Sequence, residues 1–544
     1  MADYEAARRS FRLEVPRVFN AARDIVDAWA AREPGKTAVV AVDPSGEGRR
    51  VSFAELSRAS DRAANFLAAH GVRKGDRVFV MLPRVPAWHE VLLGCVKLGA
   101  IPMPGTTLLT AHDIEYRVAK AEAKVAVTDA DGLPRVVEAS ARCPSLTTLI
   151  TIGDDVPSGW LGWRDGLDAA ADTPPDAEPT LADDPLLIYF TSGTTGYPKM
   201  VLHTQASYGI GHEITARFWQ DLGPDDLHWT VSDTGWAKAA WGKLFGQWRM
   251  GAAVFLWDVR GKPDFERMLR LIGDHGVTTF CAPPTVFRAF VQMDLAAFDL
   301  RSVRHVVSAG EPLNPEMIDR WRAGTGLTIY DGYGQTETVN LVANYPCVPV
   351  REGSMGKPTP GFDIEITDDE GGLLGPGEEG HITVRVSPER PVGLFKEYWR
   401  DPDATASAFV GERYFTGDKA YADDDGYLWF VGRADDVITS SAYRIGPFEV
   451  ESALLTHPSV VEAAVVGKPD AMRGEIVKAF VTLARGVEPS DDLVRALQAH
   501  CKRETAPYKY PREIEFVPEL PKTISGKIRR VELRDRERGE ARSR

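Results

Sequence analysis

Residues 186–199 read Leu-Leu-Ile-Tyr-Phe-Thr-Ser-Gly-Thr-Thr-Gly-Tyr-Pro-Lys, an apolar run followed by a short polar loop. The loop carries four Ser and Thr hydroxyls, two glycines and a lysine. Glycine lets the backbone approach an anion, hydroxyl and N–H groups donate to its oxygens, and lysine supplies positive charge. The Gly-x-x-x-x-Gly-Lys-Ser/Thr spacing of another phosphate loop is absent. The stretch predicts a buried strand that ends at a phosphate-binding loop, since a solvated turn explains only part of this composition.

Similar apolar runs recur on both sides of this stretch, separated by longer segments of helical period. Such alternation predicts strands that are joined by crossover helices and therefore lie in largely parallel sheets. We expect an α/β protein with a large N-terminal lobe of parallel-sheet subdomains, a small β-barrel-like unit, and a small mobile α+β C-terminal domain. The predicted strands of the large lobe are 77–82, 124–128, 186–190, 277–281, 303–307 and 327–330.

Three of these strands run directly into distinctive loops. The strand ending at Phe190 precedes the hydroxyl-rich loop, the one ending at Val307 precedes Ser-Ala-Gly-Glu-Pro, and the one ending at Tyr330 precedes Asp-Gly-Tyr-Gly-Gln-Thr-Glu. Ligands of parallel sheets bind at the carboxyl ends of the strands. We therefore predict that the three loops share one site.

The pattern changes after residue 350. Hairpin strands at 362–367 and 381–386 flank a glycine-rich acidic loop, which predicts a small antiparallel unit. The polar link 432–436 marks a boundary, so the predicted domains are 1–434 and 435–544. A compact α+β lobe is expected beyond it, and the charged tail from 529 is expected to be a solvated helix end. Its elements are predicted at 448–455, 460–466, 476–483 and 492–501.

The composition narrows the classes of partner. The 544 residues include 64 basic and 78 acidic side chains, a net charge of −14, which disfavours nonspecific binding to nucleic acid or anionic membranes. No apolar run approaches the roughly 20 residues that cross a bilayer, and the first thirty residues lack an apolar secretory segment. The five cysteines are scattered, as in a reduced compartment. We predict a cytoplasmic protein with no membrane span.

Four further blocks accompany the loop that begins at Thr191. With it, they resemble the blocks of the adenylate-forming superfamily, which includes acyl-CoA synthetases, luciferases and peptide-synthetase adenylation domains. The resemblance spans about residues 20–535, and stretches 443–451 and 505–511 are most similar to medium-chain acyl-CoA synthetases. It implies that a carboxylate attacks the α-phosphorus of ATP to give acyl-AMP, from which CoA then displaces AMP. The blocks are Tyr333-Gly-Gln-Thr-Glu337, Tyr414-Phe-Thr-Gly-Asp418, Gly432-Arg-Ala-Asp-Asp436 and Pro521-Lys-Thr-Ile-Ser-Gly-Lys527.

The resemblance also implies the ATP-binding residues. Thr336 is expected at the α-phosphate and Glu337 at Mg²⁺, a hard cation that prefers oxygen. Asp418 is expected to accept from the ribose hydroxyls beside Arg433, although a surface salt bridge between these two is the plain alternative. Phosphate contacts are expected from Thr191, Ser192, Gly193, Thr194, Thr195, Gly196 and Lys199, and nucleoside contacts from Gly310, Glu311, Pro312, Asp331, Gly332, Tyr333 and Gly334.

The C-terminal lobe is expected to supply the remaining machinery. By similarity, Lys527 bridges the carboxylate and the α-phosphate during adenylation, and Asp435 is the hinge about which the lobe rotates between the two steps. CoA contacts are implied for Ser441, Arg444, Arg473, Lys502 and Tyr510. Ala442 departs from the family, which usually has Gly beside the CoA tunnel, and its added methyl group is expected either to be tolerated or to slow the thiol step.

Six of the 13 tryptophans fall between Trp219 and Trp257, where the family builds its acyl pocket. Aromatic walls favour apolar acyl groups, although each tryptophan could equally be ordinary core. We predict a pocket containing Trp236, Lys238, Trp241 and Gly334, and a short-to-medium-chain or branched fatty acid as substrate. Lys238 or Lys243 is expected to close the tunnel or reach solvent. The expected partners are the acid, ATP and CoA, with a monomer or homodimer as the assembly.

Other functions share the same motifs. An aryl acid such as benzoate is the alternative substrate, and a stand-alone enzyme that loads a carrier protein would use the same ATP blocks. Against carrier loading, the sequence ends shortly after Lys527 without a carrier module. A light-emitting oxidase is not distinguished by these motifs. A non-enzymatic nucleotide binder is disfavoured because Lys527 is present.

Overall fold

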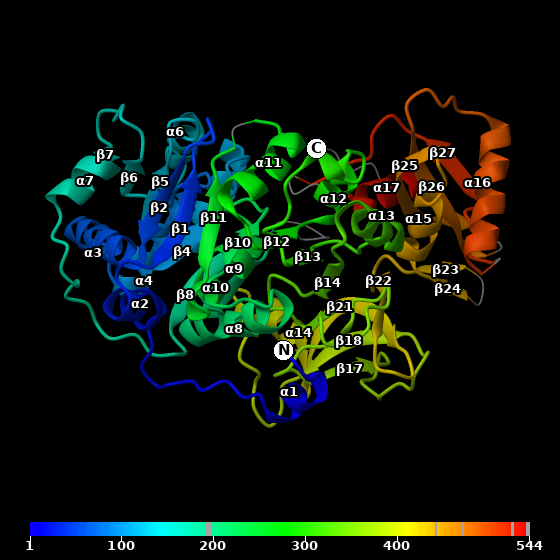
Figure 1. Ribbon diagram of the computed structural model, residues 1–544, viewed down its shortest axis with the longest axis horizontal. Helices are drawn as coiled ribbons and strands as arrows, with labels where there is room; N and C mark the ends of the chain where they lie inside the picture. Colours follow the sequence, from blue (N-terminus) through cyan, green and yellow to red (C-terminus); the bar gives the residue numbers. More distant parts are fainter. Residues whose placement is uncertain are drawn as a thin grey trace.

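The structure is a computed structural model. It describes residues 1–191, 198–259, 261–440, 443–470, 473–506, 508–523 and 527–539. Figure 1 shows a large body, which holds most of the sheets, and a separate C-terminal lobe at one end of the molecule, drawn in orange and red.

A nine-stranded sheet forms the centre of the large lobe. Its six middle strands are parallel, as the alternation of strands and helices predicts, and antiparallel strands complete both edges. The order across the sheet is β16 (Lys357–Pro358), β15 (Val342–Ala343), β14 (Ile329–Tyr333), β13 (His305–Ala309), β12 (Thr279–Ala282), β10 (Leu227–Thr230), β11 (Ala253–Trp257), β1 (Thr37–Val42) and β2 (Gly48–Ser52).

A second, fully parallel sheet is built from the chain between residues 77 and 162. Helix α3 (Phe53–Ala69) begins with a capping box between Ser52 and Glu55, and packs on α4 (Pro86–Leu98), which ends at Gly99 with φ of +69°. The strand order is β4 (Ile101–Pro104), β3 (Arg77–Met81), β5 (Val125–Thr128), β6 (Thr148–Thr151) and β7 (Leu161–Gly162).

The strand before the hydroxyl-rich loop does not join either parallel sheet. Strand β8 (Pro185–Phe190) pairs antiparallel with β9 (Met200–Thr204), which in turn pairs antiparallel with β19 (Glu397–Tyr398). The expectation of a parallel strand here is wrong, because the nine-residue loop turns the chain straight back on itself rather than leading into a crossover helix.

The remaining helices of the large lobe cover these sheets. Buried side chains fill three separate clusters between the helices and the sheets. The helical segments are α1 (Tyr4–Ser10), η1 (Ala22–Asp27), α2 (Ala28–Arg32), α5 (Ala111–Ala121), α6 (Leu133–Ser140), α7 (Trp163–Ala169), η2 (Gln205–Ile210), α8 (His212–Ile214), η3 (Thr215–Trp219), α9 (Ala237–Lys243), α10 (Phe245–Arg249), α11 (Phe265–His275), α12 (Pro284–Phe290), η4 (Leu295–Ala297), α13 (Pro315–Thr325) and α14 (Pro402–Ala408).

The predicted antiparallel unit follows the nine-stranded sheet. The hairpin from 364 to 385 pairs with a long strand that contains Asp418, and this strand pairs with the one that ends at Arg433. The strands are β17 (Ile364–Thr367), β18 (Gly380–Arg385), β20 (Phe409–Val410), β21 (Arg413–Ala422) and β22 (Leu428–Arg433).

The C-terminal lobe has its own sheet and core. Helix α17 (Arg530–Glu537) packs on this lobe through the buried Leu533, and Arg530 forms a bidentate pair with Glu451 at 2.9 and 2.6 Å. The expectation of a solvated helix end is therefore wrong for this part of the tail. The other elements are β23 (Ile438–Ser440), β24 (Tyr443–Ile445), α15 (Pro447–Leu455), β25 (Val460–Asp470), β26 (Gly474–Leu483), α16 (Asp491–Glu504) and β27 (Glu513–Phe516).

Candidate active site

Two of the three predicted loops leave neighbouring parallel strands. Ala309 at the end of β13 is in register with Gly332 in β14, so residues 310–312 and 333–337 begin side by side. Gly310 has φ of +108°, a conformation that favours glycine. Burial raises the pKa of Glu311, while positive charge from Lys527, Arg288 and Lys238 opposes this rise. The structure thus brings the predicted nucleoside residues together.

A buried network joins the second loop to the antiparallel unit. Tyr333 Oη donates to Asp418 Oδ2 at 2.6 Å, and Gln335 Nε2 donates to the same oxygen at 2.7 Å. Gln335 also accepts from Tyr414 Oη at 2.8 Å. Asp418 and Arg433 are register partners on β21 and β22, with 3.4 Å between their charged groups. The side chain of Asp418 is 6% exposed and that of Arg433 is 40% exposed, so an ion pair is present with its carboxylate buried, and the ribose role of Asp418 stays a prediction.

Thr336 is fixed through its backbone. Its carbonyl oxygen accepts from Tyr208 Oη at 2.6 Å and lies 2.8 Å from Nε2 of His203, which must donate because a carbonyl only accepts. Burial lowers the pKa of His203 to about 3, so the ring is neutral. The two rings stack with centroids 3.4 Å apart. This buried support fixes the backbone of the loop that carries Thr336, the residue predicted to contact the α-phosphate.

Glu337 and Lys199 meet at a third residue, Tyr398. The Tyr398 hydroxyl donates to Glu337 Oε1 at 2.8 Å, and Lys199 Nζ lies 4.6 Å from the centroid of the same ring. Lys199 closes the base of the hydroxyl-rich loop, where its carbonyl accepts from the N–H of Thr191 at 3.0 Å. The five residues Ser192, Gly193, Thr194, Thr195 and Gly196 lie outside the described residues.

Lys527 comes to this site from the C-terminal lobe. Its positive charge opposes the rise in the pKa of Glu311 and of Asp418, so the C-terminal lobe carries this cation toward the loops at 310–312 and 333–337. No ion pair joins Lys527 to either carboxylate among the described residues. Thr523 supports the segment, since its N–H donates to the carbonyl of Lys527 at 2.7 Å and its hydroxyl accepts from the N–H of Lys527 at 3.1 Å. The Lys527 residue is exposed, so its place is set by how the lobe is oriented.

Asp435 lies in the connection between β22 and β23. Its carbonyl accepts from Arg534 at 2.7 Å, and Arg534 also pairs with Asp436 at 2.6 Å. The Asp435 carboxylate is 3.7 Å from Nε of Arg433. The predicted hinge is thus tied on one side to the nucleotide network and on the other to α17.

The predicted CoA residues fall into two places on the C-terminal lobe. Lys502 Nζ lies 3.9 Å from the ring centroid of Tyr510, whose hydroxyl accepts from Arg512 at 3.2 Å. Arg473 is exposed beside Gly474, the register partner of Ser440. Ser441 and Ala442, next to Ser440, lie outside the described residues, as does the side chain of Arg444. No contact between described residues joins the two places.

Most of the tryptophan-rich segment lies in the core. Trp229 and Trp257 pack with Phe255 and Phe280 in one core cluster, and Trp241 and Trp219 belong to another, where they pack edge-on at 6.0 Å. A β-carbon at Gly334 would lie 2.4 Å from Cη2 of Trp241, so these two predicted pocket residues touch. Trp236 is the residue just before α9.

Two lysines of this segment turn inward. Lys238 Nζ donates to the carbonyl of Ala309 at 2.7 Å, and Lys243 Nζ donates to that of Thr230. Lys243 is fully buried, and burial lowers its pKa to about 7. The expectation that one of them reaches solvent is wrong for Lys243. Lys238 instead links helix α9 to the nucleoside loop.

Sequence reasoning assigned no role to Gln335 or Tyr398. Gln335 lies inside the quoted 333–337 loop, so an amide in a glycine-containing turn was a usable signal. No sequence pattern pointed to Tyr398. It reaches the site because β19 pairs with β9, where Tyr398 is the register partner of Val201.

The described residues offer neither a metal-binding cluster nor a membrane-spanning helix. Within the described ranges, no cluster of three or more His, Cys, Asp or Glu side chains could by itself hold a metal ion. Among the same residues, no helix has the length and apolarity to cross a membrane.

Comparisons with known proteins agree with this geometry. The family model of the AMP-binding enzyme matches residues 26–399, and that of the AMP-binding enzyme C-terminal domain matches 449–527. Acyl-coenzyme A synthetase ACSM3, mitochondrial, of Mus musculus is 45% identical over 98% of this chain and 93% of its own length. Acyl-coenzyme A synthetase ACSM4, mitochondrial, of Homo sapiens is 46% identical over 99% of this chain and 93% of its own length.

Two solved structures are similar over nearly the whole chain. The anthranilate CoA ligase AuaEII in complex with anthranoyl-AMP superposes with a TM-score of 0.89 at 32% identity, covering 97% of this chain and 99% of that one. The benzoate CoA ligase from Burkholderia xenovorans LB400 superposes with a TM-score of 0.82 at 30% identity, covering 95% of this chain and 100% of that one.

The comparisons contradict one expectation. The predicted cytoplasmic location is wrong, because the curated relatives above are mitochondrial proteins. The prediction rested on scattered cysteines and the lack of an apolar secretory segment. Those features bear on secretion and redox environment and do not separate one reducing compartment from another.

Proposed function

This chain belongs to the AMP-binding enzyme family, as one of its acyl-coenzyme A synthetases, and we propose that it activates a short-to-medium-chain or branched fatty acid. A carboxylate oxygen of the acid attacks the α-phosphorus of ATP, and the bond to pyrophosphate breaks. The CoA thiolate then attacks the acyl carbon, and the bond to AMP breaks. The main support is that a buried network of Tyr333, Gln335 and Asp418 lies at the strand ends of a chain that is 45% identical over 98% of its length to an acyl-coenzyme A synthetase.

The nucleoside is proposed to lie across the two neighbouring loops. Asp418 is suited to accept from ribose hydroxyls through Oδ1, which faces Arg433 and keeps acceptor capacity, while two hydrogen bonds to Oδ2 fix the carboxylate in place. Tyr333 is held by its hydroxyl, which leaves the ring as a flat wall for the base. Gly310, Glu311 and Pro312 line the other side.

The phosphates are proposed to lie between Thr336, Lys199 and the hydroxyl-rich loop. Phosphoryl substitution needs charge neutralised on oxygen more than it needs a protein nucleophile. Mg²⁺ fits a site with one carboxylate, Glu337, because this ion is commonly held by one or two carboxylates and by substrate phosphates. When bound, Mg²⁺ would supply positive charge at those phosphates.

The second step is proposed to follow rotation about Asp435. Rotation would withdraw Lys527 and bring in the residues proposed for CoA, namely Ser441, Arg444, Arg473, Lys502 and Tyr510. Lys502 and Arg473 are exposed in this arrangement, as expected for groups that act only after the lobe turns. Ala442 adds a methyl group where the family usually has Gly. The names of the curated relatives favour CoA over a carrier protein as acceptor.

The acyl group is proposed to lie between Trp241, Gly334 and Trp236. The contact between Trp241 and Gly334 closes one wall and limits length. An aryl acid is the second candidate, because both similar ligase structures named above act on aryl acids. The assembly, monomer or homodimer, stays a prediction.

A panel of carboxylic acids tests the proposal. Linear, branched and aromatic acids of about two to twelve carbons are assayed for pyrophosphate release with ATP, and for loss of free CoA thiol. We expect release that depends on both acid and ATP, highest for short-to-medium or branched chains. A strict preference for acetate would contradict the pocket assignment, and release without thiol loss would contradict CoA as acceptor.

A further inference from the structure

Tyr398 lies between two residues that are proposed to face the phosphates. Its hydroxyl donates to Glu337 Oε1 at 2.8 Å, and its ring lies 4.6 Å from Lys199 Nζ. Tyr398 is 61 residues from Glu337 in sequence, and it belongs to neither loop. One side chain thus contacts the carboxylate and the ammonium at the same time.

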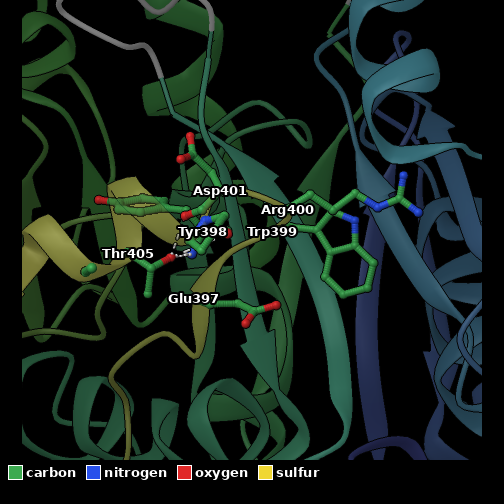
Figure 2. Close-up of a pocket in the computed structure, with 8 residues that line it drawn as sticks. Glu397, Tyr398, Trp399, Arg400, Asp401 and Thr405 are labelled. Atoms are coloured by element: carbon green, nitrogen blue, oxygen red, sulfur yellow. Dashed lines mark hydrogen bonds between the residues drawn. The ribbon is translucent and has the colours of Figure 1, made fainter.

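The ring of Tyr398 is fixed on several sides. Its strand pairs with β9 opposite Val201, and its N–H donates to Thr405 Oγ1 at 2.9 Å. The ring packs on Phe395 with centroids 4.8 Å apart and is 7% exposed. Figure 2 shows the hydrogen bond to Thr405 and shows Trp399 and Arg400 directed to the opposite side of the strand from Tyr398.

Glu337 and Lys199 carry opposite charges and contact the same ring of Tyr398. Opposite charges attract each other at short distance, so a lysine and a glutamate this close to one ring would be expected to form an ion pair. Both residues are described, and no ion pair joins them. The phenol donates to the carboxylate, and its π face attracts the ammonium. A direct ion pair would occupy the groups that metal and phosphate need.

We propose that Tyr398 is a positioning residue that holds Glu337 and Lys199 apart and aims both at the phosphates of the nucleotide. The hydroxyl sets the carboxylate for the metal, and the ring sets the ammonium for phosphate oxygen. The inference rests on the proposed function, since it assumes that Mg·ATP binds between these residues.

Two substitutions separate the two contacts. Tyr398→Phe removes the hydroxyl and keeps the ring, whereas Tyr398→Leu removes both. The binding of ATP is measured by isothermal titration calorimetry with Mg²⁺ and with EDTA, and the ratio of the two affinities is the readout. Tyr427→Phe is the matched control, because that hydroxyl donates to the carbonyl of Pro349 at 2.6 Å in another part of the lobe.

We expect Tyr398→Phe to reduce the affinity gained from Mg²⁺ about tenfold, the effect of one hydrogen bond to a charged group, with ATP binding in EDTA unchanged. Tyr398→Leu should also weaken binding in EDTA by about threefold, because Lys199 is released. Tyr427→Phe should match the parent.

Two outcomes overturn the inference. One is a full Mg²⁺ gain in Tyr398→Phe, and the other is an equal loss with Mg²⁺ and with EDTA, which would indicate a structural role only. Failure of the parent enzyme to bind ATP or release pyrophosphate would instead contradict the proposed function itself. The two failures are thus distinguishable.

Discussion

The carboxylate of Asp418 in the large lobe and three cations of the C-terminal lobe are held in opposite ways. In the large lobe, Asp418 is 6% exposed and receives hydrogen bonds from Tyr333 and Gln335. In the C-terminal lobe, Lys527, Arg473 and Lys502 are exposed. Hydrogen bonds to a buried group fix its position before ligand binds, whereas an exposed cation acts only where its lobe carries it. This contrast supports the proposal that the large lobe binds the nucleotide and the C-terminal lobe rotates.

The largest effect is expected from the exposed lysine. Lys527→Ala should lower acyl-AMP formation by about a hundredfold to a thousandfold, the range for losing one preorganised electrostatic contact to the reacting group. Conversion of supplied acyl-AMP to the thioester should be largely spared. Pyrophosphate release and thiol loss measure the two steps.

Arg529→Ala is the matched control for that variant. Arg529 is a cation two residues away that pairs with Glu532 at 2.9 Å, and half of its side chain is exposed. The Arg529→Ala variant should form acyl-AMP at the rate of the parent enzyme. Full adenylation by Lys527→Ala would contradict the proposed role of the exposed lysine. Positive charge from the C-terminal lobe would then not be needed at the site of the large lobe.

The next effect is expected at the connection between the lobes. Asp435→Pro restricts the backbone at the proposed hinge and should trap one arrangement, so that one step slows by about ten to a hundredfold relative to the other. The same two assays measure the ratio of rates. Normal rates for both steps would contradict the hinge, and equal slowing of both would indicate general damage to the fold.

Acid stability is a different kind of effect, and it should differ between the lobes. Burial lowers the pKa of His89 and His305 to about 4, and of His203 and His228 to about 3; all four lie in the large lobe. In the unfolded chain each of these histidines takes up a proton near pH 6.5, whereas in the folded lobe it stays neutral at that pH. The free energy of unfolding therefore falls as the pH drops below about 6.5. The C-terminal histidines, His457 and His500, are only partly buried.

Hydrogen exchange at pH 7 and pH 5, corrected for the intrinsic rate, measures this difference. Protection in β10 and β13 should fall more than in β25 and β26, by at most about 1.4 kcal/mol per pH unit for each histidine. A parallel loss in both lobes would show that the buried histidines do not set acid sensitivity.

Much of the site could be predicted because strand ends are local signals. The loops at 308–312 and 331–337 each follow a short β-branched run, and parallel strands bring their carboxyl ends to one edge. The register of Ala309 with Gly332 follows that prediction. The prediction failed for β8, since a strand's sequence does not reveal whether its partner runs parallel or antiparallel.

The sequence by itself determined the elements and the reactive groups: an α/β chain, a phosphate-type loop at 191–199, and acidic, aromatic and cationic residues in recognisable blocks. Only the tertiary structure decided which of them touch. Tyr398 reaches Glu337 because β19 pairs with β9, Lys238 turns inward to Ala309, and α17 docks through Leu533 and Arg530. Such contacts depend on pairing and packing between segments distant in sequence, and no local pattern records them.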